Sequence, residues 1–435
     1  MTIAASTASS TVPSTKTSAV TTVDLPATPA GEQLTWVLRS AATAYDAEFE
    51  ARFSPAFFAQ APVDALRQQI AAAGVTGVVE IVASQPTELI VLADSAAGRV
   101  AITITVDAAA PHRILGLLAQ PGELPEPPTT WAEVDSRLRA TAPNTAYLAA
   151  EVGKDGSVTT LHASKADDSV PLGSAFKLYV LGAVVRSVES GALTWDRQLT
   201  ITDAIKSLPS GELQDRTTGS TVTVREAAEK MIQISDNTAA DLLATTVGRD
   251  AVEQMLEPMG MGAASRQRTL PFLTTRQLFT LKWGGGAESV ARYSAASTEE
   301  RRALLATMTD RLPGPNDLDP SVPNAIDSIE WFATPAEIVA AHAWLDAYRS
   351  KPGYEALDTI LGSNPGVPVS TDVWSSSAFK GGSEPGVVFL GWLLHRNDGR
   401  VFSVVVSASD TRAAVDELEA ASIGQGIIEL LGEQP

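Results

Sequence analysis

Four prolines within residues 121–128 divide this chain of 435 residues into two parts. Proline lacks a backbone hydrogen-bond donor and has a fixed φ, so neither a helix nor an inner strand runs through such a segment. We therefore expect an extended linker over residues 121–129, with a separate core on each side of it. Hydrophobic residues make up 44% of the chain, which is enough to build both cores.

Residues 32–120 have the pattern of a small α+β domain. Aromatic residues recur at roughly helical spacing from Trp36 through Tyr45 to Phe58, and strand-like runs follow between residues 78 and 119. A helical layer followed by an antiparallel sheet is an α+β arrangement. The aromatic residues indicate a core, since large apolar side chains are usually buried. Residues 1–31 contain 13 serines and threonines and only two charges, which predicts a disordered tail.

Residues 130–435 have strand-like runs at both ends and helical periodicity between them. A hairpin is expected around Lys154-Asp-Gly156, and further strands are expected at residues 377–380, 387–394 and 401–407. The segment from Phe176 to about residue 361 is largely helical in its pattern. We predict that the two ends share one antiparallel sheet flanked by helices. The middle would then form an all-helical lobe, with a cleft between lobe and sheet.

The composition excludes several functional classes. The absence of cysteine excludes disulfides, thiol nucleophiles and Cys-bound metals, and the four histidines are too scattered for a metal site, so we expect neither metal nor cofactor. The net charge of −19 argues against nucleic-acid binding. No apolar run approaches the roughly 20 residues of a membrane span. No signal peptide or lipobox is visible, which predicts a cytoplasmic location; secretion of a trimmed form is the alternative. Nothing in the sequence indicates an oligomeric state.

Ser174-Ala-Phe-Lys177 opens a strongly apolar helical run. Residues three apart lie on one face of a helix, so the serine hydroxyl and the lysine amine would be neighbours. A neutral lysine can take the serine proton if burial and a second nearby cation lower its pKa. Alone the pattern is weak, because Ser377-Ala-Phe-Lys380 repeats it and a serine at a helix start is an ordinary N-cap.

Two further motifs follow in order along the chain. Ser235-Asp-Asn237 lies between two helical runs, and Lys380-Gly-Gly-Ser383 lies on an expected strand. Glycines beside a strand edge leave room for a substrate to lie against the backbone. In this order the three motifs resemble those of class A β-lactamases and the related penicillin-recognising serine hydrolases. The resemblance covers residues 130–435.

Longer stretches resemble the subfamily of the esterase-like protein of the clavulanic-acid biosynthesis cluster, an antibiotic-biosynthesis setting. They are Leu172-Gly-Ser-Ala-Phe-Lys-Leu-Tyr179, Ser207-Leu-Pro-Ser-Gly211, Pro271-Phe-Leu-Thr274 and Phe379-Lys-Gly-Gly-Ser-Glu-Pro-Gly386. That subfamily joins a steroid-isomerase-like (cystatin-type) α+β domain to a β-lactamase-like domain. The resemblance implies the same pair of folds here, in the same order.

The resemblance also implies an acyl-enzyme mechanism without a cofactor. Ser174 would be the nucleophile and Lys177 its general base. Ser235 would relay a proton to the leaving group, and Lys380 would stabilise charge and orient that hydroxyl. The remaining implied residues bind the substrate or form the oxyanion hole: Asn237, Gly381, Gly382 and Ser383.

One departure from the family bears on the substrate. Class A β-lactamases deacylate with a glutamate from a Glu-x-x-Leu-Asn loop, whereas residues 265–274 of this chain contain no acid. We therefore predict an esterase acting on small or cephalosporin-like esters, with weak or no β-lactamase activity. A base supplied from elsewhere, including the small domain, is one alternative. Two others are a penicillin-binding acyltransferase or weak β-lactamase, and a non-catalytic binding module.

Overall fold

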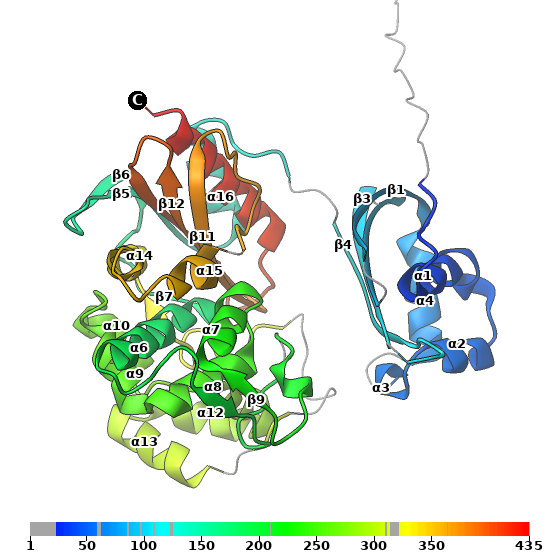
Figure 1. Cartoon of the computed structure of the whole chain (residues 1–435), viewed down its shortest axis with the longest axis horizontal. Coiled ribbons are helices and arrows are strands. Elements are labelled where there is room, and N and C mark those ends of the chain that lie inside the picture. Colours follow the sequence, from blue (N-terminus) through cyan, green and yellow to red (C-terminus); the bar gives the residue numbers. More distant parts are fainter. Residues whose placement is uncertain are drawn as a thin grey trace, which may run out of the picture. The chain divides into compact units, whose positions relative to one another are not determined.

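The chain forms two compact units in this computed structural model, and they divide between residues 123 and 124 (Figure 1). The structure describes residues 23–58, 62–84, 87–95, 98–107, 109–121, 125–208, 210–308, 311–313, 322–362 and 364–434. Most of the predicted tail (residues 1–22) and residues 122–124 of the predicted linker lie outside this description.

Two predicted boundaries are wrong. Helix α1 (Pro29–Arg39) begins inside the predicted tail, because the Thr28 side chain accepts a hydrogen bond from the Gly31 amide and Pro29 suits a first helical turn. Strand β4 (Ile114–Pro121) reaches the first residue of the predicted linker. Its last residue pairs with Val100 on the neighbouring strand, so the ladder continues to the first proline of the cluster.

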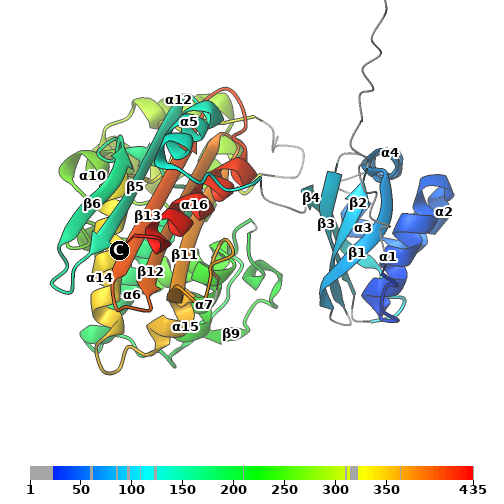
Figure 2. The same cartoon turned by 90° about the horizontal axis from the view of Figure 1, so that it is seen from above.

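The first unit is an α+β domain in which helices pack on one face of a four-stranded antiparallel sheet (Figure 2). The sheet has the strand order β1-β2-β3-β4, with β1 (Val75–Ser84), β2 (Glu88–Ser95) and β3 (Gly98–Val106) preceding β4. The helices after α1 are α2 (Asp46–Arg52), α3 (Pro55–Phe58) and α4 (Val63–Ala73). Ile102, Ile104 and Val106 alternate into the core, as the sequence predicts for a strand with one buried face.

An aromatic cluster forms the core between the helices and the sheet. Trp36, Phe49 and Phe53 are buried, and the Trp36 and Phe49 ring centroids lie 5.3 Å apart in an edge-to-face arrangement. The core prediction is wrong for Tyr45, which is 80% exposed. Tyr45 is the N-cap residue of α2, and the buried side chain of that helix is Phe49.

The second unit is built on a five-stranded antiparallel sheet with the order β11-β12-β13-β5-β6. Its strands are β5 (Asn144–Val152), β6 (Val158–Ser164), β11 (Trp374–Glu384), β12 (Val387–Arg396) and β13 (Val401–Ser409). Pairing of β5 with β13 runs from Asn144–Ser409 to Val152–Val401, so the two ends of the unit share the sheet as predicted.

Both faces of this sheet are buried. On β13, Val404 and Val406 face helices α5 (Trp131–Thr141) and α16 (Glu417–Gly432), whereas Val405 belongs to the core shared with the helical lobe. Figure 2 shows α16 lying across one face of the sheet, with α14 (Pro335–Arg349) beyond the other. Because successive side chains of a strand point to opposite faces, β13 contributes alternately to the core under α5 and α16 and to the core shared with the helical lobe.

The middle of the unit forms the predicted helical lobe. Its helices are α6 (Lys177–Glu189), α7 (Val224–Gln233), α8 (Asn237–Val247), α9 (Arg249–Leu256), α10 (Ala263–Thr269), α11 (Thr275–Phe279), α12 (Gly286–Ala295), α13 (Thr298–Thr307) and α15 (Ala356–Gly362). The short strand pairs are β7 (Val170–Pro171) with β10 (Phe332–Ala333), and β8 (Gln198–Thr200) with β9 (Thr221–Thr223). No helix within the described residues is long and apolar enough to cross a membrane.

The prediction that Ser174 lies on the first turn of the long apolar helix needs a correction. Ser174 lies in a separate 3₁₀ turn, η2 (Gly173–Phe176), and α6 begins only at Lys177. The tighter turn still places the serine hydroxyl beside the lysine amine, because side chains three residues apart eclipse in a 3₁₀ helix.

Candidate functional site

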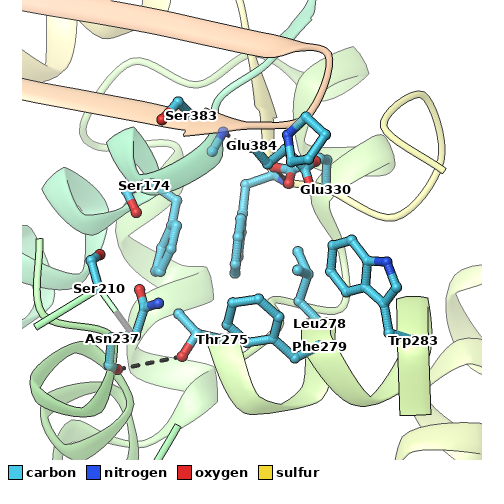
Figure 3. A pocket seen from close by; sticks show the side chains of 14 residues that line it. Ser174, Ser210, Asn237, Thr275, Leu278, Phe279, Trp283, Glu330, Ser383 and Glu384 are labelled. Carbon is cyan, nitrogen blue, oxygen red and sulfur yellow. Dashed lines mark hydrogen bonds between the residues drawn. The ribbon is translucent and has the colours of Figure 1, made fainter. Parts of the chain in front are cut away.

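A pocket of about 360 Å³ opens where the lobe meets strand β11 (Figure 3). Fourteen described residues line it, and they come from η2, α8, α11, the π-helical turn η4 (Thr280–Gly284), β11 and the loops between them. Ser174 and Ser383 lie on the wall formed by η2 and β11, and Ser210 and Asn237 lie opposite them. The structure thus brings residues from all three sequence motifs to one cavity.

Lys177 is the centre of the polar network at this pocket. Its side chain is fully buried, and its Nζ lies 2.9 Å from Ser174 Oγ, 3.0 Å from Ser235 Oγ and 2.7 Å from Asn237 Oδ1. Nζ also donates to the Ser235 carbonyl oxygen over 2.6 Å. The predicted base therefore contacts both the predicted nucleophile and the relay serine.

Burial changes the protonation of both lysines. Desolvation lowers the pKa of Lys177 well below its usual 10.5, and the charge of Lys380 lowers it further, against the opposing effect of two aspartates. Desolvation also lowers the pKa of Lys380 to about 7. Lys380 Nζ lies 3.0 Å from Ser235 Oγ, so the two amines share this hydroxyl. Both conditions for a neutral base beside Ser174, burial and a second cation, are present.

The turn that carries Ser235 is held in an uncommon conformation. Ser235 has a φ of +56°, which costs energy for a residue with a side chain. The adjacent Asp236 is fully buried and caps α8, and its Oδ2 accepts hydrogen bonds from the Glu212 and Leu213 amides at 2.8 and 2.9 Å. Asp236 therefore anchors the turn. Sequence reasoning did not assign this role, although aspartate just before a helical run is a common N-cap.

Asn237 lies on the pocket wall, but its amide is already used within the protein. Its Oδ1 accepts from Lys177, and its Nδ2 donates to the Leu208 carbonyl oxygen over 3.0 Å. These hydrogen bonds leave the second Nδ2 proton of Asn237 for the substrate contact that the resemblance implies. In the structure the residue positions Lys177.

Glycine is required where η2 meets β11. Gly173 has a φ of +48°, and a Cβ at that position would lie 2.9 Å from the Ser383 amide nitrogen. A Cβ at Gly382 would lie 2.1 Å from the Leu172 carbonyl oxygen and 2.4 Å from the Ser174 amide nitrogen. These contacts bring the Ser174 and Ser383 amides to the same wall. Gly381 contributes its carbonyl oxygen, which accepts from Lys380 Nζ at 2.5 Å.

A buried ion cluster, which sequence reasoning missed, lies behind this wall. Lys282 is fully enclosed, lies 3.4 Å from Glu330 and also contacts Glu384. Glu330 Oε2 accepts from the amides of Gly173 (3.2 Å) and Trp331 (3.1 Å). Burial raises the pKa of Glu384 well above its usual range, Lys282 opposes this shift, and Glu330 adds to it. No sequence pattern relates residues 282, 330 and 384, so only the fold reveals the cluster.

Residues 265–274, which contain no acid that could serve in deacylation, form most of α10 and the turn before α11. Glu257, the nearest acid before it, pairs with Arg266 at 2.7 Å. Among the pocket-lining residues that the structure describes, the carboxyl groups are those of Glu330 and Glu384, and none is a histidine. Within the described ranges, no group of three or more His, Asp or Glu side chains is placed to hold a metal ion.

Comparisons with known proteins gave one family match in each unit. Residues 136–319 match the family described as the beta-lactamase enzyme family, and residues 25–110 match the family described as ORF 12 gene product N-terminal. A beta-lactamase structure from Sphaerobacter thermophilus DSM 20745 is 21% identical, with a TM-score of 0.47 over 69% of this chain and 96% of that one. One from Chitinophaga pinensis DSM 2588 is 17% identical, with a TM-score of 0.47 over 69% and 97%. No curated protein matches the sequence.

Proposed function

We propose that the second unit, a β-lactamase-like serine hydrolase domain, is an esterase that forms an acyl-enzyme on Ser174. The observation that carries this proposal is the 2.9 Å contact between Ser174 Oγ and the buried amine of Lys177. A neutral amine at this distance can accept the hydroxyl proton as the oxygen attacks a carbonyl carbon.

Acylation requires that the negative charge on the carbonyl oxygen be stabilised. We assign this role to the backbone amides of Ser174 and Ser383, which the close approach of Gly173 and Gly382 brings to one wall. Loss of one such donor typically raises the barrier by about 3 kcal/mol. The substrate carbonyl would therefore lie between η2 and β11.

The leaving alcohol must then receive a proton. Ser235 Oγ lies within 3.0 Å of both Lys177 Nζ and Lys380 Nζ, so it can pass the proton that Lys177 has taken from Ser174 to the departing oxygen. Lys380, with a pKa of about 7, can carry positive charge near this oxygen at neutral pH. An alkoxide needs less protonation than a departing amine, which favours esters over amides.

Deacylation limits the choice of substrate. Of the carboxyl groups described at the pocket, Glu384 binds Lys282, while Glu330 binds Lys282 and two backbone amides. Neither is free to activate water, which leaves Lys177 as the base. We therefore propose slow release of a β-lactam-derived acyl group, and hence weak or no β-lactamase activity. The same feature supports a second candidate, a penicillin-binding acyltransferase.

For the first unit we propose a steroid-isomerase-like, cystatin-type fold. The support is its α+β arrangement, with helices packed on one face of a four-stranded antiparallel sheet. An experimental structure of the chain whose first unit superimposes better on a different α+β fold would refute this assignment. The fold carries no implication of isomerase activity.

The esterase proposal is tested with an activated short ester and a cephalosporin carrying a 3′-acetate. Wild-type protein should release acetate, and Ser174→Ala should not. Ser377→Ala is a matched control, because Ser377 belongs to the second copy of the same four-residue pattern. Equal activity in wild type and Ser174→Ala would refute the proposal. Mass spectrometry after exposure to penicillin separates the two candidates: a persistent adduct on Ser174 without ester turnover would favour the acyltransferase.

A further inference from the structure

The two ends of the pocket differ in their chemistry (Figure 3). One end has the hydroxyl groups of Ser174 and Ser210 and the amide of Asn237. The other end is formed by Leu278, Phe279 and Trp283, which point into the cavity from α11 and η4. A substrate whose carbonyl lies at Ser174 would extend its larger organic group toward this second end.

Aromatic surface dominates the second end. Phe279 and Trp283 are half-buried, and their ring centroids lie 5.8 Å apart. Phe176 and Trp331 also line the pocket, and their rings stack at 3.7 Å. An apolar cavity of about 150 Å³ is sufficient to hold benzene. The pocket, at about 360 Å³, therefore has room for a phenyl ring beside the reacting carbonyl.

The charges at this end disfavour a carboxylate. The fourteen lining residues include two glutamates, Glu330 and Glu384, and no arginine or lysine. Lys282 contacts both carboxyl groups, but its side chain is 0% exposed. A substrate carboxylate placed here would lose its water without gaining a cationic partner.

From this arrangement, and on the basis of the esterase function proposed above, we infer that the preferred substrate is an ester bearing an uncharged aromatic group. The ring lies against Leu278, Phe279 and Trp283, in either the acyl or the alcohol part of the ester. A carboxylate on that ring is disfavoured, because no lysine or arginine among the lining residues replaces the water that the carboxylate loses.

Three simple esters test the preference for a ring: ethyl acetate, ethyl phenylacetate and benzyl acetate, followed by acid release at constant pH. These esters avoid an aromatic chromophore, which would itself occupy the aromatic end. At least one of the two aromatic esters should have a kcat/KM about tenfold or more above that of ethyl acetate, a ratio equivalent to about 1.4 kcal/mol. The 4-carboxy derivative of that ester should lose at least tenfold relative to its parent.

Variants locate the preference in the pocket. Trp283→Ala should lower the ratio of aromatic to aliphatic kcat/KM at least fivefold, and Phe279→Leu provides a milder second variant if the first is unstable. Trp344→Ala is the matched control, because Trp344 packs on Tyr348 and does not line the pocket. Its ratio should equal that of wild type.

The outcomes distinguish this inference from the function on which it depends. If ethyl acetate is hydrolysed as fast as both aromatic esters, or the carboxylated ester as fast as its parent, the substrate inference is overturned and the esterase function stands. If no ester is hydrolysed and mass spectrometry finds no acyl group on Ser174, both are overturned.

Discussion

Replacing Lys380 by methionine should stabilise the second unit while stopping its proposed activity. The lysine side chain is buried, with 3% exposure, and desolvation lowers its pKa from the usual 10.5 to about 7. At pH 7 the unfolded chain keeps this amine charged, whereas the folded protein holds it half-deprotonated. At about 1.4 kcal/mol per pKa unit, burying the lysine costs about 4 kcal/mol at this pH.

Methionine has a similar unbranched shape and no charge to desolvate. The substitution removes the contacts of Lys380 Nζ with Ser235 Oγ and with the Gly381 carbonyl oxygen, which together contribute about 2 kcal/mol. The expected net gain is therefore about 2 kcal/mol at pH 7. For a domain of this size that corresponds to a rise in Tm of a few degrees.

The stability gained by Lys380→Met should depend on pH. The folded-state pKa is lowered, so the cost of the buried lysine is fully present below pH 7 and fades as pH rises from about 7 toward 10.5. Above pH 7 the advantage of Lys380→Met should thus shrink by up to about 1.4 kcal/mol per pH unit.

The assay is urea denaturation between pH 6 and 9, followed by tryptophan fluorescence. Seven of the eight tryptophans lie in the second unit, with Trp36 alone in the first, so the signal reports mainly on the second unit. Lys351→Met is the matched control, since the Lys351 side chain is 46% exposed. A less stable Lys380→Met at pH 7, or a stability difference that does not change with pH, would refute the reasoning.

Three other predictions follow from the site. The pH profile of kcat/KM for ester hydrolysis should be bell-shaped. The rate rises as Lys177, whose pKa is lowered by burial, loses its proton, and it falls as Lys380 loses its proton near pH 7. A profile without the falling limb would mean that Lys380 acts uncharged. Gly382→Ala should reduce kcat at least 100-fold, because its Cβ would lie 2.1 Å from the Leu172 carbonyl oxygen; near-normal kinetics would contradict the proposed oxyanion wall. Asp236→Ala should lower the free energy of unfolding by about 3 kcal/mol, because three backbone amides lose their acceptor; an unchanged urea midpoint would show that water replaces the carboxylate.

The sheet and the motifs of the second unit were predictable because their signals are local. Short apolar runs mark the strands, and strand patterns at both ends of a long helical segment predict that the two ends share one sheet, as the pairing of β5 with β13 shows. The contact between Ser174 and Lys177 follows from a spacing of three residues. These features need no knowledge of distant packing, and the structure agrees with them.

The rest depends on tertiary contacts. The cluster of Lys282, Glu330 and Glu384 joins three segments that are 48 and 54 residues apart in sequence, so no window of sequence contains it. The amide of Asn237 was available to a substrate in the sequence argument, but the lobe places Leu208 and Lys177 against it. In both cases the sequence does not show which side chains from distant segments the fold brings into contact.

The concentration of unfavourable groups around one pocket argues against a purely structural or binding role for the second unit. Two buried lysines have lowered pKa values, burial raises the pKa of Asp241 to about 6, and Ser235 has a positive φ. Each of these features weakens the folded state; apolar residues of similar size would remove the cost of the buried ionisable groups, and glycine would remove that of the positive φ. They all lie at or directly behind the contact between Ser174 and Lys177. A protein that only bound a ligand would gain stability by losing them, so their presence supports the chemistry that we propose at Ser174.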